Sequence, residues 1–186
     1  MNEEKIIKKY TIKVYEKLPS THLDVKENLD KLKNGTVIIA NEQTDGIGTH
    51  GRRWYTGNSN IAISILYKPE CDITKLDGIT INIAKSIQEA ISELYNIELK
   101  IKYPNDLLLN NKKICGILTE INTISKKVNY LIISIGFNVN EVNFDDEISK
   151  IATSLKKEYQ KDFDKELIIY KIIEKIDKIT EFVWME

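Results

Sequence analysis

The loop formed by residues 43–54 carries the residue types best suited to chemistry. It contains three glycines, two arginines and a tryptophan, and it joins two strongly apolar runs at residues 37–40 and 61–66. Glycine lets the backbone adopt left-handed conformations and approach a ligand closely, while free N–H groups and arginines bind anions. The pattern predicts either an anion-binding loop between two strands or a hairpin loop with a solvated basic tip.

A second polar cluster surrounds Pro104, between two further apolar runs. Lys102, Asn105 and Asp106 lie within five residues of one another. Asparagine and aspartate beside proline are normally turn residues. The alternative is a nucleotide site, because Mg²⁺ takes one or two carboxylates and otherwise keeps water and substrate oxygens. On that interpretation Asn105 and Asp106 help to place a phosphate-bound Mg²⁺, and Lys102 supplies positive charge to the phosphate.

The third informative stretch begins at Lys112 and Lys113 and continues as an apolar strand with Gly116 in its interior. A glycine inside a strand often marks the close approach of a ligand. Because side chains alternate along a strand, we expect Lys113 to share a face with Cys115 and Ile117. On an inner face it would be a partly desolvated cation, and at a strand edge it would discourage aggregation.

Strand-end cations, glycines and a carboxylate suit nucleotide chemistry, but two common nucleotide folds are excluded. No GxxxxGK[ST] motif occurs, and the glycine loop does not connect a strand to a helix, so Walker-type and Rossmann-type sites are not expected. A net charge of −1 does not fit a protein that binds nucleic acid by bulk charge.

The composition also bears on two questions: whether the chain has a zinc site, and in which cellular compartment it is expected. Two histidines and two separated cysteines do not form a zinc pattern, and the cysteines are interpreted as structural thiols of a reducing cytosol. No secretory signal is present, and no apolar run reaches the roughly 20 residues that a membrane span needs. The sequence predicts a cytoplasmic protein without a membrane or nucleic-acid partner.

The elements that must position these residues follow from apolar periodicity and turn residues. We expect strands at residues 6–18, 36–40, 60–67, 99–102, 107–109, 114–121 and 128–139, with a polar turn at residues 122–127. We expect helices at residues 22–33, 74–95, 146–159 and 164–184, the last with Val183 on its apolar face. This order predicts an α+β fold with a mostly antiparallel sheet and helices packed chiefly on one face.

Several ordered stretches together resemble the catalytic domain of biotin–protein ligases, a family in the biotin and lipoate ligase superfamily with a class II aminoacyl-tRNA synthetase-like fold. Ser20-Thr21 resembles an S-T-N segment with His22 in place of asparagine, and residues 43–54 resemble Q-x-x-G-R-G-x-x-G-R-x-W. Residues 102–120 resemble K-W-P-N-D-L-x-x-x-x-x-K-x-x-G-I-L-x-E. Residues 136–138 and 152–155 resemble G-I/V-N and A-T-S-L. The resemblance extends over most of residues 12–185.

The resemblance implies a ligase with two steps. The carboxylate of biotin attacks the α-phosphate of ATP with Mg²⁺ assistance, giving biotinyl-5′-AMP and pyrophosphate. A lysine on the biotin carrier domain of a carboxylase or decarboxylase then takes the biotin. Relatives often dimerise through the sheet, so the expected state is a monomer or a weak homodimer.

The resemblance also implies three sets of site residues. The catalytic set is Lys113, Arg52, Lys102 and Asp106, with Asp106 also implied for Mg²⁺. The biotin-binding set is Ser20, Thr21, Gln43, Gly46, Trp54, Lys113, Gly116 and Ser134. The ATP-binding set is Arg52, Arg53, Trp54, Lys102, Asn105, Asp106, Asn138 and Ala152.

The glycine loop departs from the family pattern at its centre. Ile47 and Thr49 stand where the family usually has arginines, so we expect weaker retention of the adenylate than in arginine-rich members. His50 follows them and is interpreted as an exposed loop residue rather than a general base.

Residues 1–186 are expected to form a single catalytic domain, without an N-terminal winged helix–turn–helix and without a C-terminal SH3-like barrel. One alternative is lipoate or octanoyl transfer on the same fold, although the R-R-x-[ST]-G-G-G stretch of those relatives is absent. Another is a regulatory protein that binds biotin without catalysis. Ile47, Thr49 and the missing C-terminal module favour that reading, while Lys113, Asp106 and Arg52 oppose it.

Overall fold

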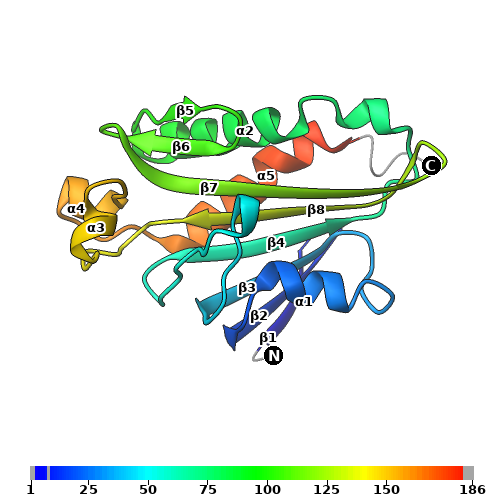
Figure 1. Cartoon of the computed structure of the whole chain (residues 1–186), viewed down its shortest axis with the longest axis horizontal. Coiled ribbons are helices and arrows are strands. Elements are labelled where there is room, and N and C mark those ends of the chain that lie inside the picture. Colours follow the sequence, from blue (N-terminus) through cyan, green and yellow to red (C-terminus); the bar gives the residue numbers. More distant parts are fainter. Residues whose placement is uncertain (1–2, 8, 182–186) are drawn as a thin grey trace.

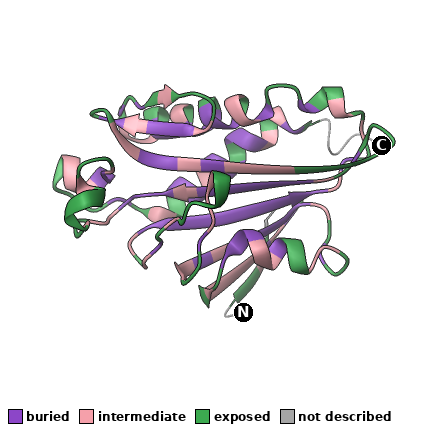
Figure 2. Ribbon diagram, viewed as in Figure 1, coloured by how far each residue is buried: buried purple, intermediate pink, exposed green. Residues whose placement is uncertain are grey.

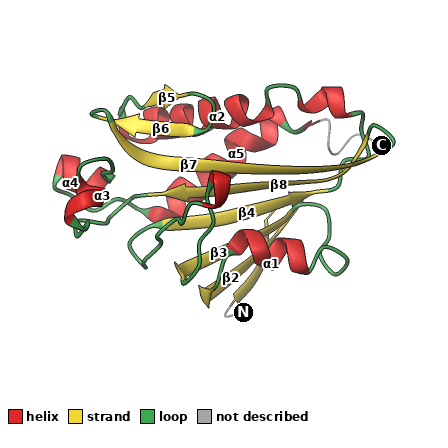
Figure 3. Cartoon of the chain, in the orientation of Figure 1, coloured by secondary structure: helices red, strands yellow, loops and turns green. Residues whose placement is uncertain are grey.

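The computed structural model describes residues 3–7 and 9–181, which form one eight-stranded sheet with helices on both faces (Figures 1 and 3). The strand order is β1-β2-β3-β4-β8-β7-β6-β5, and β2–β3 is the single parallel pair in this described sheet. The strands are β1 (Glu3–Ile7), β2 (Tyr10–Leu18), β3 (Thr36–Gln43), β4 (Ile61–Tyr67), β5 (Lys100–Lys102), β6 (Asp106–Leu109), β7 (Lys112–Ile124) and β8 (Lys127–Phe137). The predicted mostly antiparallel α+β fold is confirmed.

The middle of the sheet is buried on both faces. Every residue of β4 is buried, and Figure 2 shows β4 and most of β8 coloured as buried. Ile63 and Ile65 belong to the large hydrophobic cluster on one side, whereas Leu66 belongs to a smaller cluster on the other. A strand covered on both faces favours a continuous apolar sequence, which explains the apolar run from Ile61 to Tyr67, interrupted at Ser64.

Two long helices, α2 (Ile79–Tyr95) and α5 (Lys165–Ile179), cover one face of the sheet and pack on each other. Their buried isoleucines recur every three or four residues and fill the large cluster. The short helix α1 (Thr21–Glu27) lies on the opposite face, where Val25 packs against Ile38, Leu66 and Ile132 (Figure 1). The helices therefore lie chiefly on one face, as predicted, and α1 is the exception.

Two predicted strands are corrected. Residues 6–18 do not form one strand, because the chain reverses after Ile7 and β1 pairs antiparallel with β2. The strand predicted at residues 114–121 is longer than expected, because β7 continues to Ile124. The turn predicted at residues 122–127 is therefore limited to Ser125 and Lys126. Both of these residues have positive φ, 48° and 70°, which allows a tight reversal between β7 and β8.

Four predicted helices are also corrected. The first ends at Glu27 and not near residue 33. The second is interrupted after a 3₁₀ turn, η2 (Ile73–Leu76), because Gly78 has a φ of 71°. The fourth ends at Ile179 in the described chain, and Val183 lies outside the described residues.

The third predicted helix, at residues 146–159, is two short helices, α3 (Asp146–Ser149) and α4 (Leu155–Tyr159). Between them the helix is interrupted and the backbone pairs with β7. Lys113 N donates to Ile151 O over 2.8 Å, and Thr153 N donates to Lys113 O over 3.0 Å. This segment is therefore attached to the strand that carries Lys113.

Candidate active site

A partly open cleft lies between the loop of residues 43–54 and strands β7 and β8. All of the predicted biotin-binding residues except Gly46 line it: Ser20, Thr21, Gln43, Trp54, Lys113, Gly116 and Ser134. Of the predicted ATP-binding residues, all of which the structure describes, Trp54 and Asn105 line it. The structure thus brings most of the predicted biotin-binding residues together around the cleft, but few of the predicted ATP-binding residues.

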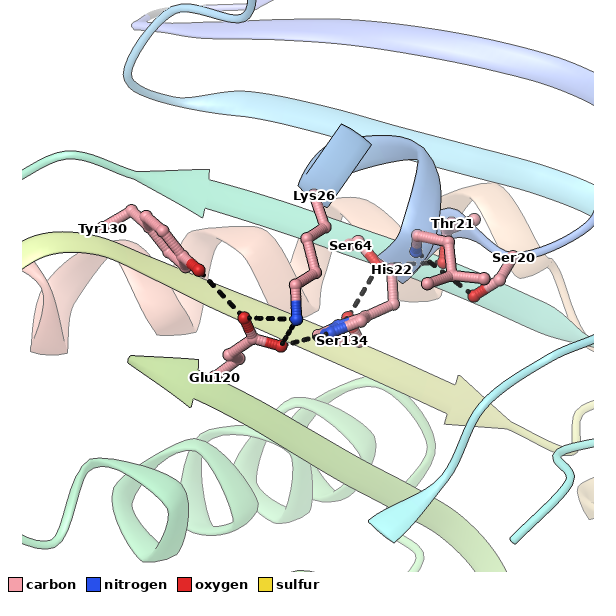
Figure 4. A network of polar contacts seen from close by, with 9 residues as sticks. Ser20, Thr21, His22, Lys26, Ser64, Glu120, Tyr130 and Ser134 are labelled. Atoms are coloured by element: carbon pink, nitrogen blue, oxygen red, sulfur yellow. Dashed lines mark hydrogen bonds and ion pairs between the residues drawn. The ribbon is translucent and has the colours of Figure 1, made fainter. Parts of the chain in front are cut away.

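The cleft floor is a continuous group of hydrogen-bonded side chains (Figure 4). Ser64 Oγ donates to Thr21 Oγ1 over 2.8 Å and lies 2.7 Å from Ser134 Oγ. The Thr21 backbone N–H donates to Gln43 Oε1 over 2.8 Å. Ser20, which is 1% exposed, caps α1 by accepting from Leu23 N. These buried polar groups satisfy one another and hold α1 against β3, β4 and β8.

His22 extends this polar floor toward β7 (Figure 4). Its Nδ1 lies 2.9 Å from Ser134 Oγ, and its Nε2 lies 3.0 Å from Glu120 Oε2. Glu120 also accepts from Lys26 and from the Tyr130 hydroxyl. Partial burial acts to raise the pKa of Glu120, but the hydrogen bonds from Lys26, His22 and Tyr130 hold that pKa below its usual range. Glu120 is therefore a carboxylate at neutral pH.

Lys113 reaches the cleft because β7 contains a bulge. Leu107 pairs with Cys115 and Leu108 pairs with Lys113, so Ile114 is an extra residue without a partner on β6. An inserted residue reverses the alternation of side chains along the strand. The prediction that Lys113 shares the face of Cys115 is therefore wrong, since Cys115 is fully buried in the core and Lys113 lines the cleft.

Lys113 is held between a carboxylate and an aromatic ring. Its Nζ lies 2.6 Å from Asp106 Oδ1 and 5.4 Å from the centre of the Trp54 ring. The contact with Asp106 is an ion pair without hydrogen-bond geometry, since this buried oxygen has no hydrogen-bond partner among the described residues. The side chain of Lys113 is 29% exposed, so the cation is partly desolvated and still reachable from the cleft.

Trp54 lies on a pair of glycines. Gly116 and Gly136 are directly opposite each other on β7 and β8. A Cβ atom on Gly136 would lie 2.2 Å from the Trp54 ring, and a Cβ on Gly116 would lie 3.0 Å from it. No residue with a side chain fits at Gly136 while Trp54 keeps this position, so the two glycines create the seat on which the indole rests.

The glycine loop folds back on itself over the cleft. Trp54 N donates to Gly46 O over 2.8 Å, and a Cβ on Gly46 would lie 2.3 Å from Trp54 O, which explains the glycine. Arg52 donates to the backbone and hydroxyl oxygens of Thr49, and both arginines of the loop are exposed. His50 is exposed with a φ of 58°, which confirms its assignment as an exposed loop residue.

The remaining predicted residues lie around the rim of the cleft or behind it. Arg53 is paired with Asp45, and Lys102 is exposed on β5. Asn105 donates to Ile117 O, whereas the buried Asn138 donates to Thr153 O. Asn138 and Ala152 therefore support the backbone beside Lys113 rather than lining the cleft.

Three residues of the floor received no role from sequence reasoning: His22, Ser64 and Glu120. Ser64 carries the clearest signal, because it is a polar residue within a run of buried apolar ones. His22 was noted as the replacement for a family asparagine. Its partner Glu120 is 98 positions away in the chain, and no local pattern joins the two.

The described residues contain no group of three or more His, Cys, Asp or Glu side chains suited to a metal ion. Cys71 and Cys115 are both free, and burial raises the pKa of each thiol, which fits a structural role. Among the helices that the structure describes, none combines the length and apolar composition needed to cross a membrane.

Comparison with known protein families shows which family the chain belongs to. The sequence pattern of the biotin/lipoate A/B protein ligase family matches residues 12–138, which include every residue that lines the cleft. The chain belongs to this family. Membership is consistent with the polar floor, the glycine loop and Lys113, all of which fall within the matched range.

Relatives within the biotin/lipoate A/B protein ligase family are longer than this chain. The bifunctional ligase/repressor BirA of Bacillus subtilis is 36% identical over 142 residues, which cover 75% of this chain and 44% of that protein. The biotin–[acetyl-CoA-carboxylase] ligase of Paracoccus denitrificans is 28% identical over 122 residues, covering 64% and 51%. The chain thus spans about half the length of these curated relatives.

A solved structure of a biotin protein ligase from Aquifex aeolicus in complex with biotin and ATP has a similar fold. The TM-score is 0.80 at 29% sequence identity, and the match covers 93% of this chain and 71% of that one. The eight-stranded sheet and its helices are therefore a biotin protein ligase fold.

Proposed function

We propose that this chain is an ATP-dependent biotin–protein ligase, which forms biotinyl-5′-AMP and then transfers biotin to a lysine of a biotin carrier domain. One observation carries the proposal: a buried polar floor and a partly desolvated lysine line the same cleft. Biotin carries a polar cyclic urea at one end and a carboxylate at the other. The names of the relatives, which are biotin ligases, support the same activity.

The floor suits the urea ring of biotin. Ser20, Thr21, Gln43 and Ser134 present hydroxyl and amide groups from three different segments, and Thr21 and Ser134 are at most 9% exposed. A site whose buried polar groups match those of the ligand rejects analogues that leave these groups unpaired. The floor therefore supplies selectivity for a cyclic urea over an apolar ring.

Lys113 suits the chemistry of the first step. A carboxylate oxygen of biotin attacks the α-phosphorus of ATP, and the bond from that phosphorus to the bridging oxygen of pyrophosphate breaks. The biotin carboxylate and the α-phosphate of ATP are both anions and must approach each other. The positive charge of Lys113 offsets their repulsion. Asp106 holds the Nζ of Lys113 in place at 2.6 Å.

In the second step a neutral lysine amine of the carrier domain attacks the acyl carbon of the mixed anhydride, and AMP leaves. The acceptor is the carrier domain of a carboxylase or decarboxylase. The loop of residues 43–54 covers the cleft and limits the access of water to the reactive anhydride. Trp54 forms part of this cover from its seat on Gly116 and Gly136.

ATP is proposed to lie toward the rim, where Arg52, Arg53 and Lys102 are exposed and Asn105 lines the cleft. Mg²⁺ is proposed to enter with the phosphates and to keep mostly phosphate and water ligands. Asp106 is 9% exposed and pairs with Lys113, so it fits a charge partner of the site better than a direct metal ligand.

The test is ATP–pyrophosphate exchange with biotin or with lipoate, followed by labelling of a purified biotin carrier domain. Biotin-dependent exchange and labelling are expected. Exchange with lipoate alone would indicate a lipoate-type ligase. Calorimetric binding of biotin without exchange would indicate a regulatory binder and overturn the proposal.

Three further predictions from the sequence accompany this proposal. We propose that the chain acts as a single catalytic unit. A cytoplasmic location stays a prediction, as does a monomeric or weakly dimeric state. Sedimentation of the purified chain with and without biotin and ATP checks the last of these.

A further inference from the structure

The floor residues form one hydrogen-bonded chain that runs from an amide on β3 to a carboxylate on β7. Its members in spatial order are Gln43, Thr21, Ser64, Ser134, His22 and Glu120. Figure 4 shows most of this chain crossing the floor beneath α1. Each hydroxyl has one proton to donate and two lone pairs, so the direction of each bond follows from its neighbours.

The direction is fixed first at Gln43. The backbone N–H of Thr21 donates to Gln43 Oε1 over 2.8 Å, which identifies this atom as the oxygen of the amide. The Thr21 hydroxyl lies 3.2 Å from the same oxygen and must donate its only proton there. Ser64 must then donate its proton to Thr21, over 2.8 Å.

The remaining bonds follow from that choice. Because the proton of Ser64 points to Thr21, Ser134 donates to Ser64 across the 2.7 Å contact. The proton of Ser134 is then used, and its oxygen can only accept from His22. The contact of 2.9 Å between Ser134 Oγ and His22 Nδ1 therefore requires a proton on Nδ1.

The other ring nitrogen faces a group that can only accept. Glu120 is a carboxylate held by Lys26 from α1 and by Tyr130 from β8, and its Oε2 lies 3.0 Å from His22 Nε2. A carboxylate oxygen has no proton to give, so this contact requires a proton on Nε2 as well. Both nitrogens of the buried ring thus donate.

We propose that His22 is a doubly protonated, specificity-determining residue of the biotin site, and this rests on the proposed function. The amide oxygen of Gln43 sets the direction of the hydroxyl bonds, and His22 completes the chain by donating from both ring nitrogens. The hydroxyls of Thr21 and Ser134 then offer the ligand lone pairs and no protons. The floor selects a neutral ligand with N–H donors, such as the urea ring, and disfavours a cation.

The charged groups that face His22 support this assignment. Glu120 on β7 is in direct contact, whereas Lys26 on α1 and Tyr130 on β8 act through Glu120. Lys113 lines the same cleft, beside its own partner Asp106. The carboxylate of Glu120 is therefore a counter-ion shared by His22 and Lys26, and a further cation in the floor would have no carboxylate of its own.

The first experiment reads the protons directly, by NMR of chain labelled with ¹⁵N-histidine at neutral pH without ligand. The chain has two histidines, and His50→Gln assigns the second signal. We expect both ring nitrogens of His22 to be protonated. A spectrum with one unprotonated nitrogen would overturn the proposal.

The variant Glu120→Gln tests the contribution of the hydroxyl chain to the protonation of His22 without the ion pair between His22 and Glu120. Its amide N–H₂ can donate to His22 Nε2, so the ring no longer needs a proton there. We expect a neutral ring that keeps its proton on Nδ1, because the hydroxyl chain still requires one. A proton on Nε2 instead would show that the hydroxyl chain does not run in the direction argued.

The second experiment measures selectivity by calorimetry with biotin and with 2-iminobiotin, whose guanidinium form has N–H donors and a positive charge. We expect the preference for biotin to fall by about tenfold in His22→Asn, which can donate to Ser134 without a charge. His50→Asn is the matched control and should keep the preference. An unchanged preference in His22→Asn would contradict a specificity role.

The two experiments distinguish failure of the proposed function from failure of the inference about His22. Absence of biotin binding would remove the proposed function, while the NMR result would still decide the charge of His22. Biotin binding with a singly protonated His22 would leave the proposed function standing and refute this inference.

Discussion

The floor and the rim of the cleft differ in how their polar groups are held. In the floor, Thr21, Ser64 and Ser134 are buried and bonded to one another across three elements. At the rim, Arg52 and Arg53 are exposed and bond only within their own loop. A single cleft therefore joins a preassembled polar surface to a set of solvent-exposed charges.

The difference follows from solvation. A buried hydroxyl without a partner costs roughly 1–3 kcal/mol, so the floor is stable only when every group is bonded. An exposed arginine is solvated by water, so leaving it without a charged partner costs little free energy. The floor is thus suited to discriminate between ligands, and the rim is suited to receive a polyanion whose charge supplies the missing partners.

The largest effect is expected where floor and rim meet, at Lys113. Replacing Lys113 by alanine removes the cation that offsets the repulsion between two anions. Biotin-dependent pyrophosphate exchange should fall by about 10²–10³-fold, by analogy with the loss of one transition-state donor. Lys112→Ala is the matched control, since that lysine bonds to Ser149 O outside the cleft. Equal losses in the two variants would refute a catalytic role for Lys113.

Gly136→Ala should break the cover of the cleft without touching a polar group. The added methyl would lie 2.2 Å from the Trp54 ring, so the indole must leave its seat. We expect biotin affinity to fall by about tenfold, or ~1.4 kcal/mol. Gly57→Ala controls for the added methyl group, because its Cβ would meet Glu141 at an ordinary 3.8 Å. Titration calorimetry measures the affinity for biotin. An unchanged affinity in Gly136→Ala would show that the position of Trp54 on Gly116 and Gly136 does not matter for biotin binding.

Ile47→Arg should add a positive charge to the rim. Ile47 lines the cleft, and the family resemblance of the loop leads us to expect arginine at this position. An added charge-assisted contact is worth roughly 1.5–3 kcal/mol when buried and less at a rim, so release of the adenylate should slow by several-fold. Filter assays of retained biotinyl-5′-AMP measure it, and faster or unchanged release would count against the expected weak retention.

Glu120→Gln tests the acid stability of the floor. The pKa of Glu120 is lowered in the folded chain, so its contribution is present above the unfolded pKa and is lost as the pH falls through the folded value. The side chain is 28% exposed, which limits the contribution to less than about 1 kcal/mol. Urea unfolding at pH 7 and at pH 3 should show a smaller difference in the variant than in the native chain.

Arg52→Ala should change folding least, because its bonds lie within one exposed loop. The free energy of unfolding should stay within about 0.5 kcal/mol of the native value. The rate of the ATP-dependent step should nevertheless fall, with Lys33→Ala as an exposed control outside the cleft. A stability loss much larger than this would show that the rim is preassembled like the floor.

The fold was predictable from periodicity, and part of the cleft lining was predictable from motif resemblance, because both are local properties of the chain. The antiparallel sheet and the long helix ending at Tyr95 follow from periodicity, and seven of the eight residues predicted from the resemblance to bind biotin line one cleft. The face of Lys113 was not predictable by alternation, since the bulge at Ile114 depends on pairing with β6. The contact of His22 with Glu120 likewise arises only when α1 packs over β7 and β8.

The two hydrophobic clusters lie on opposite faces of the sheet, and this has a consequence for which substitutions the cleft tolerates. The large cluster under α2 and α5 holds most of the buried apolar side chains, whereas five buried residues form the cluster beside the cleft. Ile63, Ile117 and Ile135 line the cleft and also belong to the large cluster, so substitutions there disturb the packing that sustains the fold. Thr21 and Ser134 lie outside both clusters, so changes at these polar positions alter the cleft without removing apolar packing.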